Sequence, residues 1–446
     1  MKKKNTLLVL IIMGTLSLFV SAPCFAVDRN DLNAEFFTRF NDDYLFQYIN
    51  EAIDNNHSAK QATIRVEEYR QGVKSQFANE LPSLSVAANY LGLHVPEITP
   101  AFNNIRKNSF VLPFVVNYEA DFLLKNRDKT KSAKKSFEMS KFDEQSVYLA
   151  LLSDVATVYT NILEYDKLIE EQEKIVANYI QILNDDNKKL SRGVINTTEL
   201  NNSTSKLEDA NITLENLLKQ REILLMQFAV LIGRNSEGYN NIARGSIDNF
   251  EYSAVIPGEI ESDVIFSRPD VKRAEMALDK AKIDIRVARK EFLPRFNITG
   301  VWAFNTIAPG SFFSWESSLA ALLAGATQDI FTGGRKIANL KYKKAKYEEL
   351  FEQYRQTDLE AVKEVNTSLC IIKHDREVEN GVNEKLKLEA INLNSADKML
   401  SRGVISKSQY LNSENRYITK DMDLTKAKTQ RLVNYYTLYK TVGGKI

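Results

Sequence analysis

Hydrophobic residues recur at seven-residue intervals in both halves of the chain. Leu200, Leu207 and Leu214 form one such series, and Tyr410, Tyr417 and Leu424 occupy the corresponding places 210 positions later. A sustained period of seven is typical of helices packed along their length as a coiled coil. The pattern therefore predicts helical pairs in each half.

The distribution of helix breakers sets the length of these helices. No Gly or Pro occurs from 114 to 192 or from 194 to 232. The second half has only Gly381 between Arg335 and Arg402, and none from 404 to 442. The stretches predict rods of about 65 and about 37 residues, on the order of 95 Å and 55 Å long.

An internal repeat organises the chain. The five residues 191–195 recur at 401–405, and 11 of the 43 aligned positions up to Gly233 and Gly443 are identical. Leu81-Pro82 matches Leu293-Pro294, and 121–127 matches 329–335. The repeat predicts a duplication over roughly 45–234 and 257–444. The predicted organisation is a leader at 1–26, a first repeat at 27–256 and a second repeat at 257–446.

The turn between the two rods has the same chemistry in both copies. Gly193 and Gly403 permit the positive φ that ends a helix. Asn196 to Glu199 and Ser406 to Gln409 are capping boxes that begin the next helix. Each tip also exposes branched apolar residues, Val194-Ile195 and Val404-Ile405, which the turn geometry does not require. The tips are therefore candidate contact surfaces.

Each repeat also carries two predicted strands. Residues 84–90 and 296–304 follow Pro82 and Pro294 and are rich in branched and aromatic side chains. After loops at 95–108 and 305–311, return strands are predicted at about 109–121 and 312–329. Strands of 9 to 13 residues are long enough to cross a bilayer when tilted (roughly 9–11 residues are needed).

The number of strands constrains the assembly. Four strands cannot close a barrel, and open strand edges are not tolerated in lipid. Two chains would supply enough strands for a filled barrel and three chains enough for one with a passage. A conducting membrane form must therefore contain at least three chains.

Composition excludes several other classes. The 446 residues carry 59 Lys+Arg against 58 Asp+Glu, a net charge of +1, which argues against a nucleic-acid partner. Three His and two Cys make a metal centre or a disulfide scaffold improbable. His57, His94 and His374 accompany no nucleophile motif, and there is no P-loop, so no catalytic activity and no cofactor are predicted.

The N-terminus has the pattern of an export signal. Lys2, Lys3 and Lys4 precede an apolar segment at 6–20, and cleavage is predicted after Ala26. The alternative is lipidation of Cys24, although Pro23 replaces the usual small residue before it. Cleavage after Ala26 leaves Cys370 as the one cysteine. No later segment offers 18 consecutive apolar residues, and the nearest is 319–326.

Several phrases together resemble a known family. They are Tyr118–Phe122, Ser267–Val271 before a helix with Ala274-Glu275, Asp329–Arg335 and the terminal Val442–Gly444. The layout resembles the outer-membrane efflux (TolC-like) channels, particularly those serving resistance-nodulation-division pumps. The resemblance implies a mainly α protein with membrane β-strands, forming a homotrimer with a twelve-stranded outer-membrane barrel and a long helical tunnel in the periplasm.

The resemblance also implies positions for functional residues. The tips at Arg192, Gly193, Val194, Arg402, Gly403 and Val404 would meet a periplasmic adaptor that serves an inner-membrane pump. The tunnel would be closed near Gln409 and Asn412, with Glu199 and Asn202 as their first-copy counterparts. Some relatives place carboxylates there, whereas this chain has amides at Gln409 and Asn412. Asp121, Asp329, Gly333 and Gly334 would shape the junction between barrel and tunnel.

Three functions follow as alternatives. The first is the outer-membrane channel of a tripartite efflux system. The second is the channel of a type I protein secretion system. The third, from a different class, is a non-conducting periplasmic adaptor or scaffold, which would not need paired bilayer-length strands. The sequence does not indicate which cargo is exported.

Overall fold

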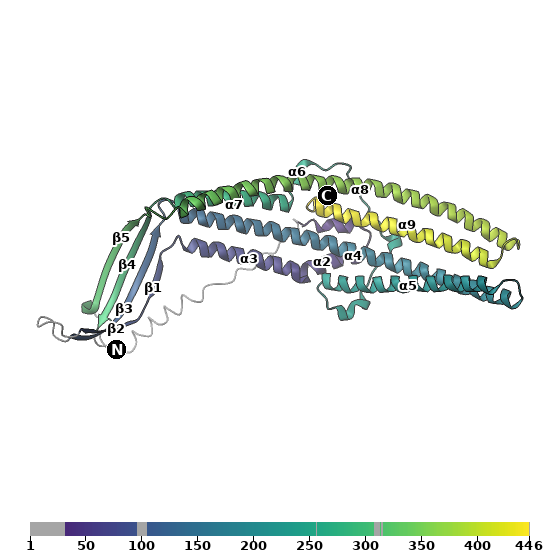
Figure 1. The fold of residues 1–446 in the computed structure, drawn as a ribbon, viewed down its shortest axis with the longest axis horizontal. Coiled ribbons are helices and arrows are strands. Elements are labelled where there is room, and N and C mark those ends of the chain that lie inside the picture. The colour runs from purple at the N-terminus through teal and green to yellow at the C-terminus, as the bar shows by residue number, and fades with distance from the viewer. Residues whose placement is uncertain (1–31, 96–104, 256, 307–312, 314, 446) are drawn as a thin grey trace.

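The molecule is elongated, with a β-sheet at one end and two helical hairpin tips at the other (Figure 1). The structure is a computed structural model that describes residues 32–95, 105–255, 257–306, 313 and 315–445. The predicted export signal at 1–26, with its cleavage site and Cys24, lies outside the described residues, as do most of the two predicted loops between strands.

The long helices occur in two matching sets. The first set is α3 (His57–Ala78), α4 (Lys125–Ser191) and α5 (Thr197–Leu231), and the second is α7 (Pro269–Lys290), α8 (Arg335–Ser401) and α9 (Lys407–Thr441). Matching helices have equal lengths of 22, 67 and 35 residues. The predicted rods are confirmed, and Gly381 lies within α8 without interrupting it.

Shorter elements fill the middle of the molecule. They are α2 (Asp43–Asn55), α6 (Ser262–Phe266) and the 3-10 helices Ala34–Arg39, Ser236–Asn241 and Ile247–Asn249. The N-terminal 3-10 helix inserts Phe36 and Phe37 against Tyr436 and Tyr439 of α9, and all four side chains are almost completely buried. This aromatic cluster belongs to the main hydrophobic core, which surrounds the middle of α4.

The described strands form one antiparallel sheet. Its strands are β1 (Ser83–Val86), β2 (Asn89–Val95), β3 (Ile105–Ala120), β4 (Arg295–Thr306) and β5 (Ser318–Thr327). The order across the sheet is β1-β3-β4-β5, with β2 also paired to β3. The edges of the sheet are therefore β1 and β2 on one side and β5 on the other.

The prediction of one continuous strand at 84–90 is wrong. β1 and β2 keep a single register along β3, with Val86 opposite Phe114 and Asn89 opposite Val111. The interruption lies opposite Pro113, which has no N–H to donate to the ladder. Because this proline lies on the neighbouring strand, the break could be predicted only if the pairing of the two strands were known.

The predicted ends of the other strands also need correction. β3 begins at Ile105, four residues before the predicted start at 109. The predicted strand at 312–329 is too long, because Trp315–Ser317 forms a 3-10 turn and β5 ends at Thr327. Thr327 lies opposite Arg295, the first residue of β4 after Pro294, so β5 has no strand partner beyond that point.

The helices form a layer in which α4 is central. Near the tips the order across the layer is α5, α4, α9, α8, and toward the sheet it is α3, α4, α7, α8 (Figure 1). One 18-residue stretch of α4 is apolar enough to cross a membrane by length and composition, but 61% of it is buried within the chain. Burial of this kind is typical of a core helix.

Candidate functional site

The two hairpin tips have the same geometry. Gly193 and Gly403 have φ of 69° and 70°, as predicted. The N–H of Gly193 donates to the Leu190 carbonyl and that of Val194 to the Lys189 carbonyl, both at 2.9 Å, which is a Schellman turn. Both predicted capping boxes are also present, at Asn196 and Ser406.

The tips present apolar side chains to solvent. Val194 is 68% exposed and Val404 is 69% exposed, and Arg192 and Arg402 are exposed beside them. A Cβ added to Gly193 or Gly403 would have no atom within 4 Å. The turn geometry therefore requires glycine for its φ alone, and the space around each tip is open to a partner.

The predicted constriction residues lie in the first two turns after each tip. The Gln409 side chain accepts a bond from the Ser406 N–H at 2.8 Å, and Glu199 accepts one from the Asn196 N–H at 3.2 Å. Asn412 Nδ2 donates to the Ser408 carbonyl at 2.8 Å. Gln409, Glu199 and Asn202 are exposed and Asn412 is half-buried. Each of the three bonded side chains is thus held by its own hairpin, and among the described residues no hydrogen bond or ion pair joins the first-copy pair to the second-copy pair.

One face of the sheet is rich in aromatic side chains, and the other, called the polar face below, mixes polar residues with apolar ones such as Val115, Val301 and Leu323. This division was not predicted from the sequence. Phe114, Trp302 and Phe304 share one face, with ring centroids 5.0 Å apart for Trp302 and Phe304. On the opposite face, Thr299 Oγ1 donates to Asn117 Oδ1 at 3.0 Å. The alternation in β4, with Phe296, Ile298, Trp302 and Phe304 between Asn297, Thr299 and Asn305, was the available signal.

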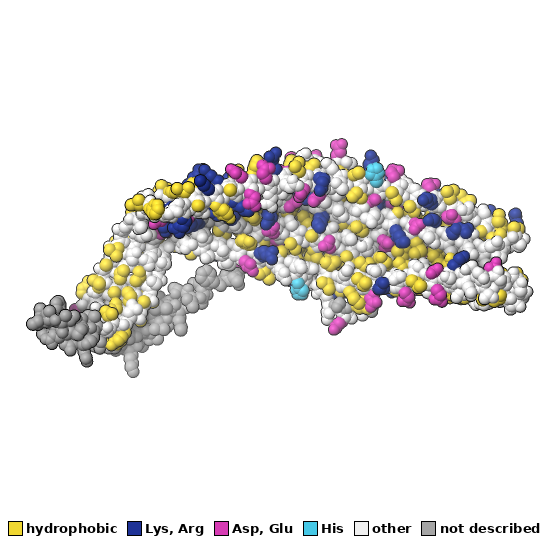
Figure 2. Space-filling view, viewed as in Figure 1, with side chains coloured by type: hydrophobic (Ala, Val, Ile, Leu, Met, Phe, Trp, Pro, Cys, Tyr) yellow, Lys and Arg dark blue, Asp and Glu magenta, His cyan; other side chains and the backbone are white. Residues whose placement is uncertain are grey.

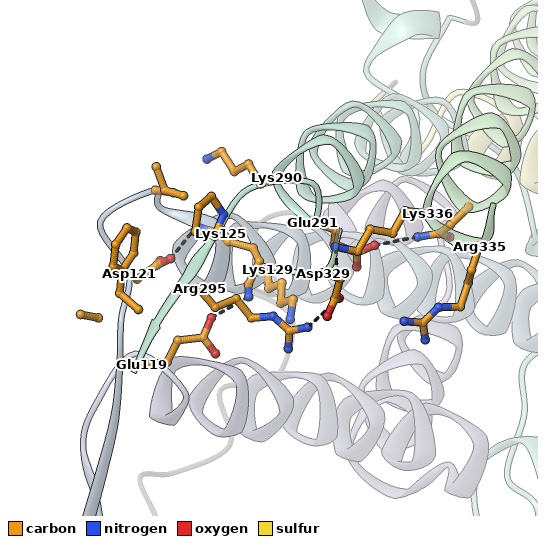
Figure 3. A pocket seen from close by; sticks show the side chains of 15 residues that line it. Glu119, Asp121, Lys125, Lys129, Lys290, Glu291, Arg295, Asp329, Arg335 and Lys336 are labelled. Carbon is orange, nitrogen blue, oxygen red and sulfur yellow. Dashed lines mark hydrogen bonds and ion pairs between the residues drawn. The ribbon is translucent and has the colours of Figure 1, made fainter. Parts of the chain in front are cut away.

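The strands meet the helices at a charged cavity of about 480 Å³ (Figure 3). Asp121, one of the predicted junction residues, accepts bonds from the backbone N–H groups of Lys125 and Arg127 at 2.6 and 2.8 Å, and so caps α4. Asp329 lies 3.2 Å from Lys336 and 3.5 Å from Arg295. The Lys336 ammonium, with help from Arg295, holds the pKa of Asp329 below its usual range.

The two predicted junction glycines shape the start of α8. Gly333 and Gly334 have φ of 59° and 81°, a conformation that disfavours other residues. Gly334 is the N-cap of α8. At the equivalent place before α4, Leu124 adopts φ of 56° without being glycine. The residue before each helix is therefore left-handed, and the first residues of the two helices, Lys125 and Arg335, line the cavity.

The sequence analysis missed the cations of this cavity. They are Lys125, Lys129, Lys290, Arg295, Arg335 and Lys336. Figure 2 shows Lys and Arg side chains gathered where the sheet joins the helices. The signal was available, because six of the eleven residues at 125–135 are Lys or Arg, and so are six of the twelve at 335–346.

Comparisons with known proteins agree with this architecture. Residues 48–234 and 262–444 match the family described as outer membrane efflux protein. The chain is 24% identical over 422 residues to the cation efflux system protein CusC of Escherichia coli K12, covering 93% of this chain and 90% of the relative. It is 25% identical over 416 residues to the outer membrane protein OprJ of Pseudomonas aeruginosa, covering 90% and 84% respectively.

A solved structure has the same fold. The crystal structure of the Campylobacter jejuni CmeC outer membrane channel superposes with a TM-score of 0.83 at 20% identity, covering 90% of this chain and 86% of that one. The family match includes both halves of the duplication and most of the chain. This chain therefore belongs to the outer membrane efflux protein family and is an outer-membrane component of efflux.

Proposed function

We propose that three copies of this chain form a continuous exit channel, closed by side-to-side contacts between copies. The observation that carries this proposal is that the helical layer and the sheet each have an open edge on both sides of the molecule. β1 and β2 leave one edge of the sheet unpaired and β5 leaves the other. Because β1 and β2 share one register along β3, they count as one strand position, and each chain supplies four. Pairing β5 of one copy with β1 and β2 of the next would close a twelve-stranded barrel, in which no edge faces lipid.

The two faces of the sheet support this placement. The face with Phe114, Trp302 and Phe304 is suited to lipid, whereas Asn117 and Thr299 give the opposite face polar side chains that can meet water among its apolar ones. The polar face would therefore line the lumen. A soluble scaffold would have no use for a sheet face that leaves Trp302 50% exposed among other aromatic side chains, so this feature disfavours the non-conducting alternative.

The edge helices carry apolar side chains that would meet in the same assembly. On α8, Leu359 is 68% exposed, Leu388 61% and Ile391 63%. On α5, Ile212 is 59% exposed and Val230 63%. Packing α8 of one copy against α5 of the next would bury both sets in a head-to-tail ring.

The hairpin tips would receive a periplasmic adaptor. Val194 and Val404 are exposed at the ends of rigid turns, as an apolar docking surface requires. The energy for export would come from an inner-membrane pump joined through the adaptor. The same tips would serve a type I protein secretion system, so the adaptor and pump decide between these two alternatives.

The resting channel would be closed near the tips. Gln409 and Asn412 lie three residues apart on α9, on one helix face. Threefold symmetry would bring three copies of each together as stacked polar rings, with Glu199 and Asn202 on the neighbouring hairpins. Opening would then be a twist of the hairpins.

The assembly is tested by mass and by cross-linking. The mature protein in detergent should have the native mass of a trimer. In a Cys370→Ser background, Leu84→Cys on β1 should form an intermolecular disulfide with a cysteine introduced at one position of β5 between 318 and 327. The matched control, Val301→Cys on the interior strand β4, should not cross-link to Leu84→Cys. A monomer with an intact β signal would overturn the proposal.

A further inference from the structure

The cavity at the junction carries more positive than negative charge. Its lining has six Lys or Arg residues against four carboxylates, which are Glu119, Asp121, Glu291 and Asp329. An adjoining hollow of about 370 Å³ adds Lys280, Lys343 and Asp284 and shares Lys129, Glu291 and Asn339 with it. Together these surfaces carry eight cations and five carboxylates, a difference of +3, although the whole chain carries only +1.

Each of the four carboxylates of the cavity already has a partner. Glu119 lies 2.6 Å from the Lys125 ammonium, and Asp121 caps α4. Glu291 accepts a bond from Asn339 at 3.1 Å, and Asp329 is shared by Lys336 and Arg295. The acidic groups of the cavity are therefore committed to contacts within the chain.

Two cations of the cavity have no such direct contact, although the charge of Arg335 still acts on Asp329. Among the residues that the structure describes, neither Lys129 nor Arg335 forms an ion pair, and Lys129 is half-buried in the cavity wall. The long helix α8 also begins here, and its N-terminal N–H groups add partial positive charge, whereas those of α4 already donate to Asp121. An anion in this cavity would meet the ammonium of Lys129, the guanidinium of Arg335 and the N-terminal end of α8.

The cavity lies on the polar side of the sheet. A third hollow is lined by Ser83, Asn117 and Thr299 of the polar face and shares Glu119 and Lys129 with the cavity. If the polar face lines the lumen, Lys129 and Arg335 face the passage where the tunnel opens into the barrel. Three copies would place a ring of such cavities around it.

We infer that this cavity is an anion-binding subsite of the exit path, and that the exported cargo carries a carboxylate, sulfonate or phosphate group. The inference rests on the proposed function. The guanidinium of Arg335 matches the geometry of such groups, and Lys129 adds a point charge. The same field raises the local concentration of anions and repels cations in the passage. This chain therefore differs in expected cargo from a relative named as a cation efflux protein.

The test is ion selectivity of the purified trimer in planar bilayers. Under a KCl gradient, the parent should favour chloride over potassium, and millimolar citrate added on the barrel side should block the current, whereas Mg²⁺ should not. The double variant Lys129→Gln/Arg335→Gln should lower the chloride-to-potassium permeability ratio about threefold and weaken citrate block by about tenfold. Both differences should shrink in about 1 M salt, where screening is strong.

A matched control separates the cavity from general surface charge. Arg127→Gln/Lys131→Gln removes one Arg and one Lys from the same helix, but neither residue lines the cavity. This control should keep the parent selectivity. Arg335→Gln alone, at an exposed position, should give a smaller shift in the same direction and remains informative if the double variant folds poorly.

The possible results distinguish failure of the anion subsite from failure of the proposed channel. Cation preference in the parent, equal selectivity in parent and double variant, or an equal loss in the control would each overturn the anion subsite while leaving the channel intact. A trimer that inserts into bilayers but conducts in no variant would overturn the proposed channel, and the subsite with it.

Discussion

The helices α4 and α8 are copies of one another, yet their environments are opposite. Each has 67 residues, and they begin and end 210 positions apart. α4 lies against α3, α5, α7 and α9, whereas α8 lies mainly against α7 and α9. Leu149 of α4 is 3% exposed, and its counterpart Leu359 of α8 is 68% exposed. The two helices thus keep equal lengths although most of their residues differ, and their burial depends on their neighbours.

This comparison predicts a large difference between two identical substitutions. Leu149→Ala should lower the free energy of unfolding by about 2–5 kcal/mol, because it leaves a cavity in the core. Leu359→Ala should leave the stability of the single chain within about 0.5 kcal/mol of the parent, because its side chain is exposed there. Thermal unfolding in detergent, followed by circular dichroism, measures both values.

The assembled state sharpens the same comparison. In a trimer, Leu359→Ala should weaken association, whereas Leu149→Ala should act on the chain itself. Trimer dissociation upon dilution, measured by native mass, separates the two effects. If Leu359→Ala changes neither association nor stability, the outer face of α8 is not an interface between copies.

The hairpins contain a second matched pair, the glycines at their two ends. Gly193 at the tip and Gly233 at the base both have positive φ and both complete Schellman turns. A Cβ on Gly233 would lie 2.6 Å from the Asn55 carbonyl oxygen, whereas one on Gly193 would meet nothing within 4 Å. Gly233→Ala should therefore destabilise the fold by about 2–4 kcal/mol, through both clash and φ.

The tip glycine should affect docking more than folding. Gly193→Val or Gly403→Val costs about 1–2 kcal/mol for the left-handed conformation and misdirects the exposed valine beside it. The trimer should remain in the membrane, while export by cells that carry the pump should be lost. Unchanged export and unchanged cross-linking to the adaptor in both variants would show that the tips are not the docking surface.

Local chemistry explains which parts of this architecture could be predicted from the sequence. The tip turns and capping boxes depend on residues within six positions of one another, and all were identified. The break between β1 and β2 depends on Pro113 of a different strand, and the end of β5 depends on where β4 begins. Such features cannot be predicted from residue types until the pairing of the strands is known.

The junction between the sheet and the helices shows the same limit on what the sequence can predict. Asp121 and Asp329 were predicted because they occupy matching places in the two copies, and Gly333 and Gly334 because glycine permits unusual φ where strand passes to helix. The cavity itself lies where the starts of α4 and α8 meet the end of α7. The repeat in the sequence does not predict that these three helix ends lie together. The two basic segments were visible in the sequence, but their common location was not.

The proposed gate allows the two copies to be compared at the end of the molecule that carries the hairpin tips. Gln409 and Asn412 are amides, whereas the first-copy counterparts are Glu199 and Asn202. Gln409→Asp/Asn412→Asp should bring like charges together across the threefold axis, where the amides of neighbouring copies would otherwise hydrogen-bond one another. The closed state should loosen by about 1 kcal/mol per bond lost, which would raise single-channel conductance and cation selectivity.

The first-copy residue supplies the control for this experiment. Asn202→Asp adds a carboxylate at the matching place on α5, where the side chain is exposed. It should change conductance less than the double variant does. Conductance and selectivity equal to the parent in the double variant would place the gate elsewhere on these helices.

The smallest expected effect concerns a carboxylate that only one copy buries. Burial raises the pKa of Glu164 on α4, and Lys426 partly opposes this shift. The matching residue on α8 is His374, which is exposed. Because the folded-state pKa of Glu164 lies above its unfolded value, its ionisation reduces stability as pH rises through the interval between the two values, and the cost is fully present above it.

Glu164→Gln should remove this cost, adding no more than about 1 kcal/mol at neutral pH and little at pH values below the unfolded pKa. Unfolding midpoints compared at acidic and neutral pH measure the difference, with His374→Gln as the matched exposed control. An equal gain for Glu164→Gln at both pH values would indicate better packing rather than relief of a buried charge, and would remove electrostatics from the contrast between the two helices.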